Sequence, residues 1–175
     1  MLNVHRLDEA LTLLGAVLDE RGQRTDVLVV GGSALLLHGV VDRPTADVDV
    51  VALLVERTFR KADVLPADLR VSIAEVGAAL GLSPTWLNTG PSALMDLGLP
   101  DGFAGRLEQR MYGGLTVHLA GREDLIALKL YAFVDQGPPS KHRQDLVALQ
   151  PTSAELRRAA RWARSHDPSD AFRTE

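Results

Sequence analysis

The chain opens with a helical pattern of apolar residues and continues with a strand, a glycine turn and a second helix. Four leucines spaced three or four positions apart mark the first helix: Leu7, Leu11, Leu14 and Leu18. Asn3 is suited to cap this amphipathic helix and Gly22 to end it. Residues 27–30 form a short apolar β run that meets two glycines, and residues 34–37 then favour a helix.

The middle of the chain predicts a second strand and a longer helix. After Pro44, residues 47–51 alternate at first between polar and apolar side chains, which is typical of a strand. We expect this strand to pair with the first one around the intervening helix. A helical pattern starts at Pro66 and ends at Gly81, and the segment 86–88 follows in a loop-like setting rich in glycine and proline.

The last third predicts a hairpin followed by helices. Residues 107–112 and 115–119 have strand composition and are separated by two glycines. Helical patterns then cover residues 123–134, 143–149 and 153–164, with breaks at Pro138-Pro139 and Pro151. The order of elements predicts an α+β fold: a small mixed sheet flanked by helices, with a helical C-terminal part.

Length and composition favour one domain over residues 1–175. The chain has 46% hydrophobic residues, and we expect a core at about 25–150, a C-terminal helix at 153–164 and a polar tail at 165–175. Because no run of eighteen apolar residues and no signal-like N-terminus occurs, we expect a cytoplasmic protein without a membrane partner. The absence of cysteine excludes disulfides, thiolate metal sites and cysteine nucleophiles.

The net charge of −4 argues against a general nucleic-acid binder, but the charge is unevenly distributed. Its balance moves from −6 over residues 1–140 to +2 over residues 141–175. The last expected helix carries a basic stripe made of Arg157, Arg158, Arg161 and Arg164. Such a stripe could seat tRNA or another polyanion, although a solvated helix face is the commoner explanation.

The glycine turn and two later aspartates form the candidate site. Gly31 and Gly32 let the backbone approach an anion such as a phosphate at the start of a helix, and Ser33 can add a hydroxyl. Asp47 and Asp49 are two positions apart on a strand, which places both carboxylates on one face. Two converging carboxylates suit Mg²⁺, which usually binds one or two protein carboxylates together with substrate phosphates.

Two structural alternatives remain for this pattern. The glycines could form a simple turn, and the two aspartates could lie on the solvent face of an edge strand. The pattern could also belong to a dinucleotide-binding fold, because Asp49 lies near the offset of a ribose-binding acid. However, Leu36 occupies the place of the third glycine, and a second aspartate has no role in ribose binding. The ordered combination of motifs therefore favours a magnesium–nucleotide site, with Arg43 close enough in sequence to contact a phosphate.

The segment from Val30-Gly31-Gly32-Ser33 to Arg43-Pro44-Thr45-Ala46-Asp47-Val48-Asp49 resembles the signature of the polymerase β-like nucleotidyltransferases. Residues 125–132 and 142–146 further resemble later motifs of the AbiEii-type nucleotidyltransferase toxins of toxin–antitoxin and abortive-infection systems. The resemblance implies an NTP-dependent nucleotidyltransferase that uses one or two Mg²⁺ ions. It also implies tRNA as the acceptor and a cognate antitoxin protein as a partner.

The resemblance assigns site roles to Lys129 and Asp145. The matching lysine of the toxins takes part in catalysis or in binding the nucleotide phosphates, and Asp145 matches an acidic position of the same site. From the residues alone, Lys129 could be a surface lysine whose end reaches solvent, and Asp145 could be a helix carboxylate paired with Lys141.

The chain departs from the superfamily at one point. Many members carry a third metal-binding carboxylate on a later strand, whereas residues 115–119 contain no acid. Asp145 could supply that acid, or the site could hold one metal ion. His118, on this strand, is expected to be half-exposed and is left outside the site. The alternatives to transfer onto RNA are adenylylation of a protein side chain and a catalytically silent nucleotide-binding module.

Overall fold

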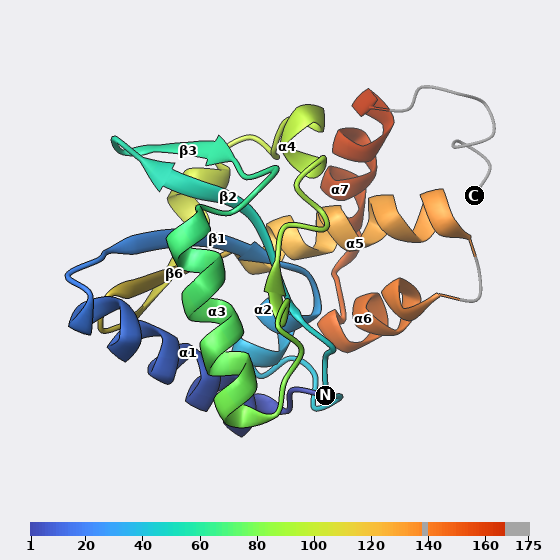
Figure 1. Ribbon diagram of the computed structural model, residues 1–175. Coiled ribbons are helices and arrows are strands. Elements are labelled where there is room, and N and C mark those ends of the chain that lie inside the picture. Colours follow the sequence, from blue (N-terminus) through green and yellow to red (C-terminus); the bar gives the residue numbers. More distant parts are fainter. Residues whose placement is uncertain (138–139, 167–175) are drawn as a thin grey trace. The chain divides into compact units, whose positions relative to one another are not determined.

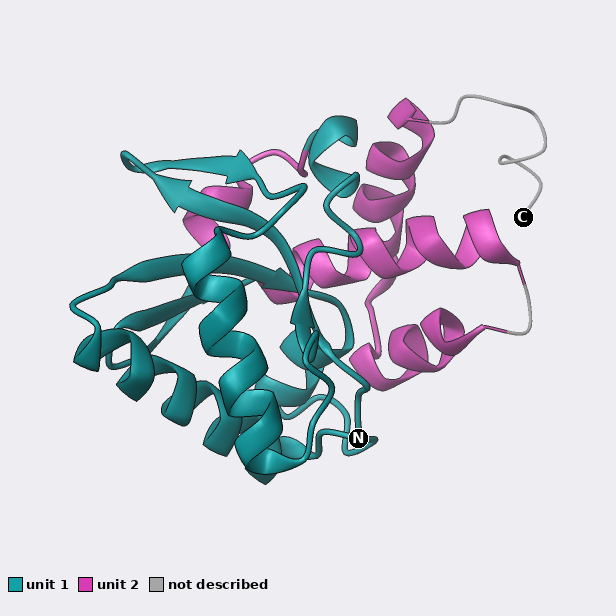
Figure 2. Cartoon of the chain, viewed as in Figure 1, with its two compact units in different colours: residues 1–98, 107–120 teal, residues 99–106, 121–175 magenta. Residues whose placement is uncertain are grey.

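A computed structural model describes residues 1–137 and 140–166. The expected break at Pro138-Pro139 and residues 167–175 of the expected tail lie outside the described residues. The chain divides into two compact units (Figure 2), each of which is described by itself. Unit 1 comprises residues 1–98 and 107–120, and unit 2 comprises residues 99–106 and 121–175. That the whole chain acts as one domain stays a prediction.

Unit 1 contains the sheet and the helices next to it (Figure 1). Its helices are α1 (Val4–Glu20), α2 (Gly31–Leu37), α3 (Ala67–Leu80) and α4 (Leu94–Leu97). Its strands are β1 (Thr25–Val30), β2 (Val48–Val55), β3 (Thr58–Lys61), β4 (Leu87–Asn88), β5 (Glu108–Tyr112) and β6 (Leu115–Leu119). Unit 2 contains the 3₁₀ turn η1 (Phe103–Arg106) and the helices α5 (Arg122–Gln136), α6 (Lys141–Leu149) and α7 (Ser153–His166).

The sheet is mixed, as the sequence predicted. Its strand order is β3-β2-β1-β6-β5, and β4 pairs with β2 outside this path. The pairs β1–β2, β2–β3 and β5–β6 are antiparallel, whereas β1–β6 and β2–β4 are parallel. With the helical C-terminal part formed by α5 to α7, this arrangement confirms the α+β fold.

The pairing of β1 with β2 contains one irregularity. Leu28 lies opposite Ala52, but Val29 lies opposite Val50, so that Val51 is passed over. Two residues of β2 therefore oppose one step of β1, which is the geometry of a β-bulge. Beyond the bulge, the last residue of β1, Val30, lies opposite Asp49.

Helix α1 confirms the prediction at both ends. The Asn3 side chain accepts a hydrogen bond from the backbone N–H of Arg6 at 2.9 Å, which satisfies one donor at the helix start. The apolar stripe is fully buried: Leu7, Leu11, Leu14 and Leu18 are all 0% exposed. The helix ends before Gly22, which has a φ of +65°. Its burial against α3, β5 and β6 supplies the hydrophobic stabilisation of this side of the sheet.

Two strands differ from the sequence-based expectation, and the short elements α4 and η1 were not predicted either. The segment 86–88, expected to be a loop, contributes strand β4, and the strand β3 was not predicted at all. Trp86 is 0% exposed and donates its indole N–H to the carbonyl of Ile73 in α3 at 3.0 Å. Trp86 is therefore an aromatic anchor on the core, and it also fixes the position at which β4 meets β2.

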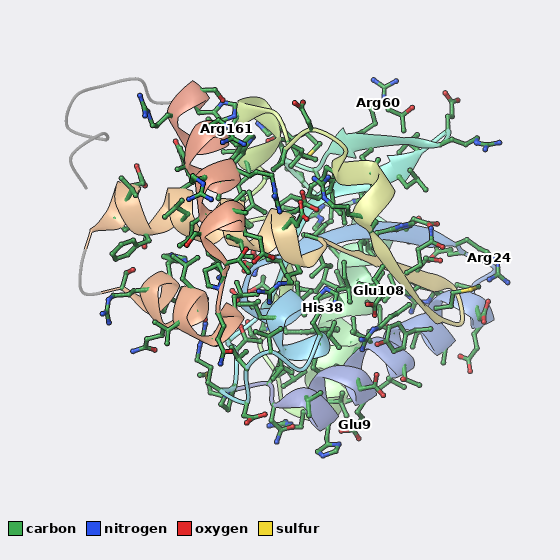
Figure 3. The ribbon with its side chains drawn as sticks, turned by 180° about the vertical axis from the view of Figure 1, so that it is seen from behind. Glu9, Arg24, His38, Arg60, Glu108 and Arg161 are labelled. Atoms are coloured by element: carbon green, nitrogen blue, oxygen red, sulfur yellow. The ribbon has the colours of Figure 1, made fainter. Side chains whose placement is uncertain are left out.

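The C-terminal end of α2 is tied to the sheet by a histidine. His38 Nε2 lies 3.0 Å from the carbonyl oxygen of Ala120, and its Nδ1 lies 3.5 Å from Oε2 of Glu108 (Figure 3). Contacts to two neighbouring chain segments hold the end of this short helix in place. The orientation of α2 follows from this tie at one end and from the glycine turn at the other.

Unit 2 is held together by charged contacts between its helices and turns. Arg106 of η1 makes a two-pronged ion pair with Asp124 of α5, whose side chain is fully buried. Burial raises the pKa of the Asp124 carboxyl, and the Arg106 guanidinium opposes that rise.

Within the described residues, no helix is long and apolar enough to cross a membrane.

Candidate functional site

The glycine turn at the end of β1 lies directly against one of the two predicted carboxylates. Gly31 has a φ of +77°, a conformation that L-residues with a side chain rarely adopt. A β-carbon placed on Gly31 would overlap with Oδ2 of Asp49. Glycine is thus needed here both for its backbone conformation and for the space that it leaves to the carboxylate.

The second glycine brings the predicted arginine to the same place. A β-carbon on Gly32 would lie 3.3 Å from Oγ1 of Thr45 and 3.8 Å from Nη2 of Arg43. The bare backbone of Gly32 therefore faces a cation and a hydroxyl. Backbone and guanidinium together form an environment that favours an anion.

Asp47 and Asp49 flank a buried valine at the start of β2. Val48 is 0% exposed, whereas both aspartates are partly exposed, as expected for side chains that alternate along an extended chain. Asp49 lies in β2, and Asp47 comes one residue before the strand begins. The carbonyl oxygen of Asp47 accepts a hydrogen bond from Oγ1 of Thr45 at 3.2 Å. Thr45 thus lies beside Gly32 and hydrogen-bonds the backbone of the first aspartate.

Asn88 is a polar neighbour of this pair that sequence reasoning did not include. It lies opposite Asp49 in the parallel pairing of β4 with β2, and its side-chain amide donates to Oδ2 of Asp47 at 3.1 Å. The sequence signal was the polar residue next to Trp86-Leu87. It was missed because the segment was expected to be a loop, where no register with β2 could be inferred.

Ser33 is placed differently from its expected role. Its side chain is 0% exposed, and Oγ donates to the carbonyl of Val30 at 3.3 Å, inside the first turn of α2. In this structure the hydroxyl therefore stabilises the turn. A contact between Ser33 and a phosphate stays a prediction, and it would require the hydroxyl to turn away from Val30.

Lys129 and Asp145 belong to unit 2, where they form an ion pair. Nζ of Lys129 lies 2.7 Å from Oδ2 of Asp145, and the two side chains are 6% and 0% exposed. The alternative of a lysine whose end reaches solvent is therefore wrong, and Asp145 is a helix carboxylate that is fully buried beside Lys129. Charged side chains are almost never fully buried unless they are paired, and this pair joins α5 to α6.

His118 is likewise more buried than expected. It is 3% exposed, and its Nε2 lies 2.8 Å from Oδ1 of Asp26 on the neighbouring strand β1. The edge of its ring contacts the ring of Phe59, with centroids 5.2 Å apart. The half-exposed placement is wrong because β6 is an inner strand of the sheet, with neighbours on both sides.

The donor set of unit 1 fits a magnesium ion. Across residues 1–137 and 140–166, no group of three or more His, Asp or Glu side chains could hold a metal ion by itself. Mg²⁺ does not need such a cage, because it retains waters and is commonly bound by one or two carboxylates plus substrate phosphates. Asp47 and Asp49 are the two carboxylates that would bind it: Asp49 lies against the Gly31 backbone, and Asp47 accepts a hydrogen bond from Asn88. The arrangement is suited to a Mg²⁺-bound phosphate ester.

Comparison with known proteins identifies a family for the chain. No curated protein and no solved structure matches it. One family model does match, over residues 4–147, a range that includes the glycine turn, the two aspartates and the Lys129–Asp145 pair. This match covers most of the chain. The chain therefore belongs to the family described as nucleotidyltransferase of unknown function (DUF6036).

Proposed function

We propose that this nucleotidyltransferase moves a nucleoside monophosphate from an NTP to a hydroxyl of an RNA acceptor, at the site formed by Gly31, Gly32, Arg43, Asp47 and Asp49. The family implies an NTP substrate. The observation that carries the proposal is the contact between the Gly31 backbone and the Asp49 carboxylate. It supports a single site in which a phosphate-binding turn and the metal-binding carboxylates act on the same substrate.

The residues of unit 1 divide the work in this proposal. Asp47 and Asp49 hold Mg²⁺, while the Gly32 backbone and the Arg43 guanidinium bind the triphosphate, with Ser33 as a further donor. The acceptor oxygen forms a bond to the α-phosphorus, and the bond from that phosphorus to the bridging oxygen breaks. Pyrophosphate leaves with the bonding electrons, and the acceptor proton passes to water. Bound Mg²⁺ would neutralise the phosphate charge that develops during transfer.

We include Lys129 and Asp145 in the proposed catalytic set. In this proposal Lys129 stabilises negative charge on the phosphates, and Asp145 keeps the ammonium charged and oriented. Their mutual distance of 2.7 Å and their burial support a fixed orientation of the ammonium. Neither residue is assigned to the metal, because the ion pair already engages the carboxylate.

The acceptor class is supported by the charge of α7. Arg157, Arg161 and Arg164 are exposed and follow a spacing of four and three residues, which aligns them on one face of the helix. Arg161 is labelled on this helix in Figure 3. Among the described residues no carboxylate pairs with these three, whereas Arg158 pairs with Glu123 at 3.2 Å. An unneutralised arginine face is complementary to a phosphate backbone.

We further propose that the activity is that of a toxin of the AbiEii type, with tRNA as its acceptor and an antitoxin protein as its partner. The support is the resemblance of residues 125–132 and 142–146 to the later motifs of those toxins. Expression without the partner should then arrest growth, and the wild-type protein should be tolerated only beside its antitoxin. Growth unaffected by an active enzyme would exclude the toxin role while leaving the transferase reaction intact.

The transfer reaction can be tested directly. The protein is incubated with Mg²⁺ and each α-labelled NTP in turn, together with total tRNA or with a cell lysate. We expect label in RNA. Asp49→Asn should abolish it, because the amide keeps the side-chain size but removes the charge that holds the metal. Asp68→Asn, an exposed aspartate in the first turn of α3, is the matched control and should label like the wild type.

The other outcomes separate the alternatives. Label in protein instead of RNA would mean that the acceptor is a protein side chain. Binding of an NTP without label in either acceptor would identify a catalytically silent nucleotide-binding module. Equal labelling by wild type and Asp49→Asn would contradict the proposed site.

A further inference from the structure

Asn88 contacts the carboxylate of Asp47 from a strand that sequence analysis did not predict. We propose that Asn88 is a positioning residue of the metal site: its amide holds Asp47 in the orientation that binds Mg²⁺. The inference rests on the proposed function, because it assigns to Asp47 the role of a metal ligand. It adds a residue on β4 to a site otherwise built from the glycine turn and the start of β2.

The hydrogen bonds of Asn88 define this role. Its Nδ2 donates to Oδ2 of Asp47 at 3.1 Å, and its Oδ1 accepts from the backbone N–H of Gly90 at 2.8 Å. The hydrogen bond from Gly90 fixes which end of the amide faces the aspartate. If the amide were reversed, its NH₂ group would face the Gly90 N–H, and two donors cannot bond to each other. Asn88 therefore presents a donor to Asp47. In this proposal Asn88 orients the carboxylate of Asp47 and does not itself bind the metal.

The backbone of β4 holds Asn88 at this place. The N–H of Val48 donates to the carbonyl of Trp86 at 2.7 Å, and Leu87 lies opposite Val48 in the strand register. Trp86 is itself locked in the core by its hydrogen bond to Ile73. The position of the amide is thus determined by a buried anchor two residues away, which is a suitable support for a group that must orient another side chain.

The lack of charge on the Asn88 side chain also matters for the site. The neutral amide donates a hydrogen bond to the Asp47 carboxylate and adds no third negative charge to the site. A carboxylate at the same position would face two like charges in the absence of a cation. An asparagine at this position therefore adds no repulsion to the two aspartates before the metal binds. Loss of a side chain that orients a metal ligand typically weakens metal binding by about 10-fold to 100-fold.

Binding of Mn²⁺ alone, followed by the electron paramagnetic resonance signal of the free ion, tests the inference without any turnover. Asn88→Ala should weaken Mn²⁺ binding by about 10-fold or more. Asn88→Asp should lower the melting temperature of the metal-free protein and increase the rise in melting temperature that Mn²⁺ produces, because the added negative charge repels the aspartates until a cation neutralises it.

Thr89→Val provides the matched control. Thr89 donates its hydroxyl to the carbonyl of Asp63 at 3.1 Å in the same loop, and within residues 1–137 and 140–166 no hydrogen bond joins it to Asp47. It reports on loosening of the loop alone and should bind Mn²⁺ like the wild type. If Asn88→Ala binds Mn²⁺ as tightly as Thr89→Val, or if Asn88→Asp responds to Mn²⁺ like the wild type, Asn88 has no positioning role.

Failure of the proposed function would look different. In that case the wild type and Asp49→Asn would bind Mn²⁺ equally weakly, and the Asn88 variants would be indistinguishable from both. Wild-type binding that depends on Asp49 but not on Asn88 would overturn only the role of Asn88.

Discussion

Gly31 and Asp49 are in such close contact that a single methyl group on the glycine would displace the carboxylate. Gly31→Ala should therefore abolish Mn²⁺ binding and nucleotide transfer, since Asp49 has to move away. An alanine held at the Gly31 φ of +77° is strained, which should lower the free energy of unfolding by about 1–2 kcal/mol. Metal binding and urea unfolding measured on the same preparation would check both effects.

The strain can be separated from the displacement by a matched glycine. Gly39 has a similar φ of +70°, and a β-carbon there would meet nothing within 4 Å. Gly39→Ala should lose about 1 kcal/mol of stability and keep its metal affinity. If both variants retain full Mn²⁺ affinity, the contact between Gly31 and Asp49 is not needed for the site.

Removal of one partner of the buried pair in unit 2 should be strongly destabilising. Lys129→Met leaves the Asp145 carboxylate buried without its cation, and Asp145→Leu does the same to the ammonium. Each single variant should lower the free energy of unfolding by about 3–5 kcal/mol, as measured by urea denaturation.

The double variant Lys129→Met with Asp145→Leu should recover most of that loss, because the two opposite charges of the pair are removed together. Its activity then tests the catalytic role apart from stability. A stable double variant that still transfers nucleotide at the wild-type rate would show that the pair serves only to join α5 to α6.

The arginine face of α7 should determine the salt dependence of RNA binding. Replacement of Arg157, Arg161 and Arg164 by glutamine should weaken RNA binding at low salt. It should also reduce the slope of log K against log salt by about 2, since each lost phosphate contact removes roughly 0.7–0.9. Fluorescence anisotropy with labelled tRNA over a range of salt concentrations would measure the slope.

A control of equal charge uses exposed arginines of unit 1, Arg57, Arg60 and Arg70. The triple glutamine variant at these positions changes the net charge by the same amount. It should leave the slope close to that of the wild type. Equal loss in both triple variants would mean that net charge alone, and no particular face, governs the interaction.

Glu155 should stabilise α7 in a pH-dependent manner. The carboxylate accepts from the backbone N–H of Thr152 at 2.7 Å and from Arg122 at 3.0 Å, and these donors lower the pKa of Glu155 from 4.5 to about 2. Because the folded-state pKa is depressed, the stabilisation is complete above pH 4.5 and is lost as the pH falls towards 2.

Glu155→Gln should accordingly lower the free energy of unfolding at pH 7 by about 1 kcal/mol, a value reduced by solvent screening of the Arg122 pair. The difference from the wild type should shrink below pH 4.5 and disappear near pH 2. Thermal unfolding across this pH range would measure it. A difference that is constant with pH would contradict the contribution of the ionised carboxylate.

The sequence predicted the elements with strong periodicity. Helix α1, the strand–glycine–helix unit and the β5–β6 hairpin appear where leucine spacing and paired glycines indicated them. Strand β3 has only four residues, most of them exposed, and so offers no apolar pattern to detect. Strand β4 has two residues and exists only through its pairing with β2, which is a tertiary contact that local sequence does not encode.

The same distinction applies to the candidate site. The glycines, Arg43 and the two aspartates could be named because their order and spacing carry a chemical meaning. Asn88 could not, since its contact with Asp47 spans 41 positions of the chain. The burial of Lys129 against Asp145 also escaped prediction, because a lysine in an apolar helix has the same sequence pattern whether its end meets water or a partner.

Because of the bulge between β1 and β2, the number of residues in β2 determines which face of the sheet carries Asp49. Before Val51, the pairing of β2 with β1 is shifted by one residue relative to the pairing after it. As a result Asp49 lies opposite Val30, and both side chains are on the same face of the sheet. In an uninterrupted ladder that continued the pairing of Leu28 with Ala52, Val50 would take this place and Asp49 would turn to the opposite face. Loss of a single residue from this strand would therefore preserve a sheet of normal appearance while turning the Asp49 carboxylate to the opposite face.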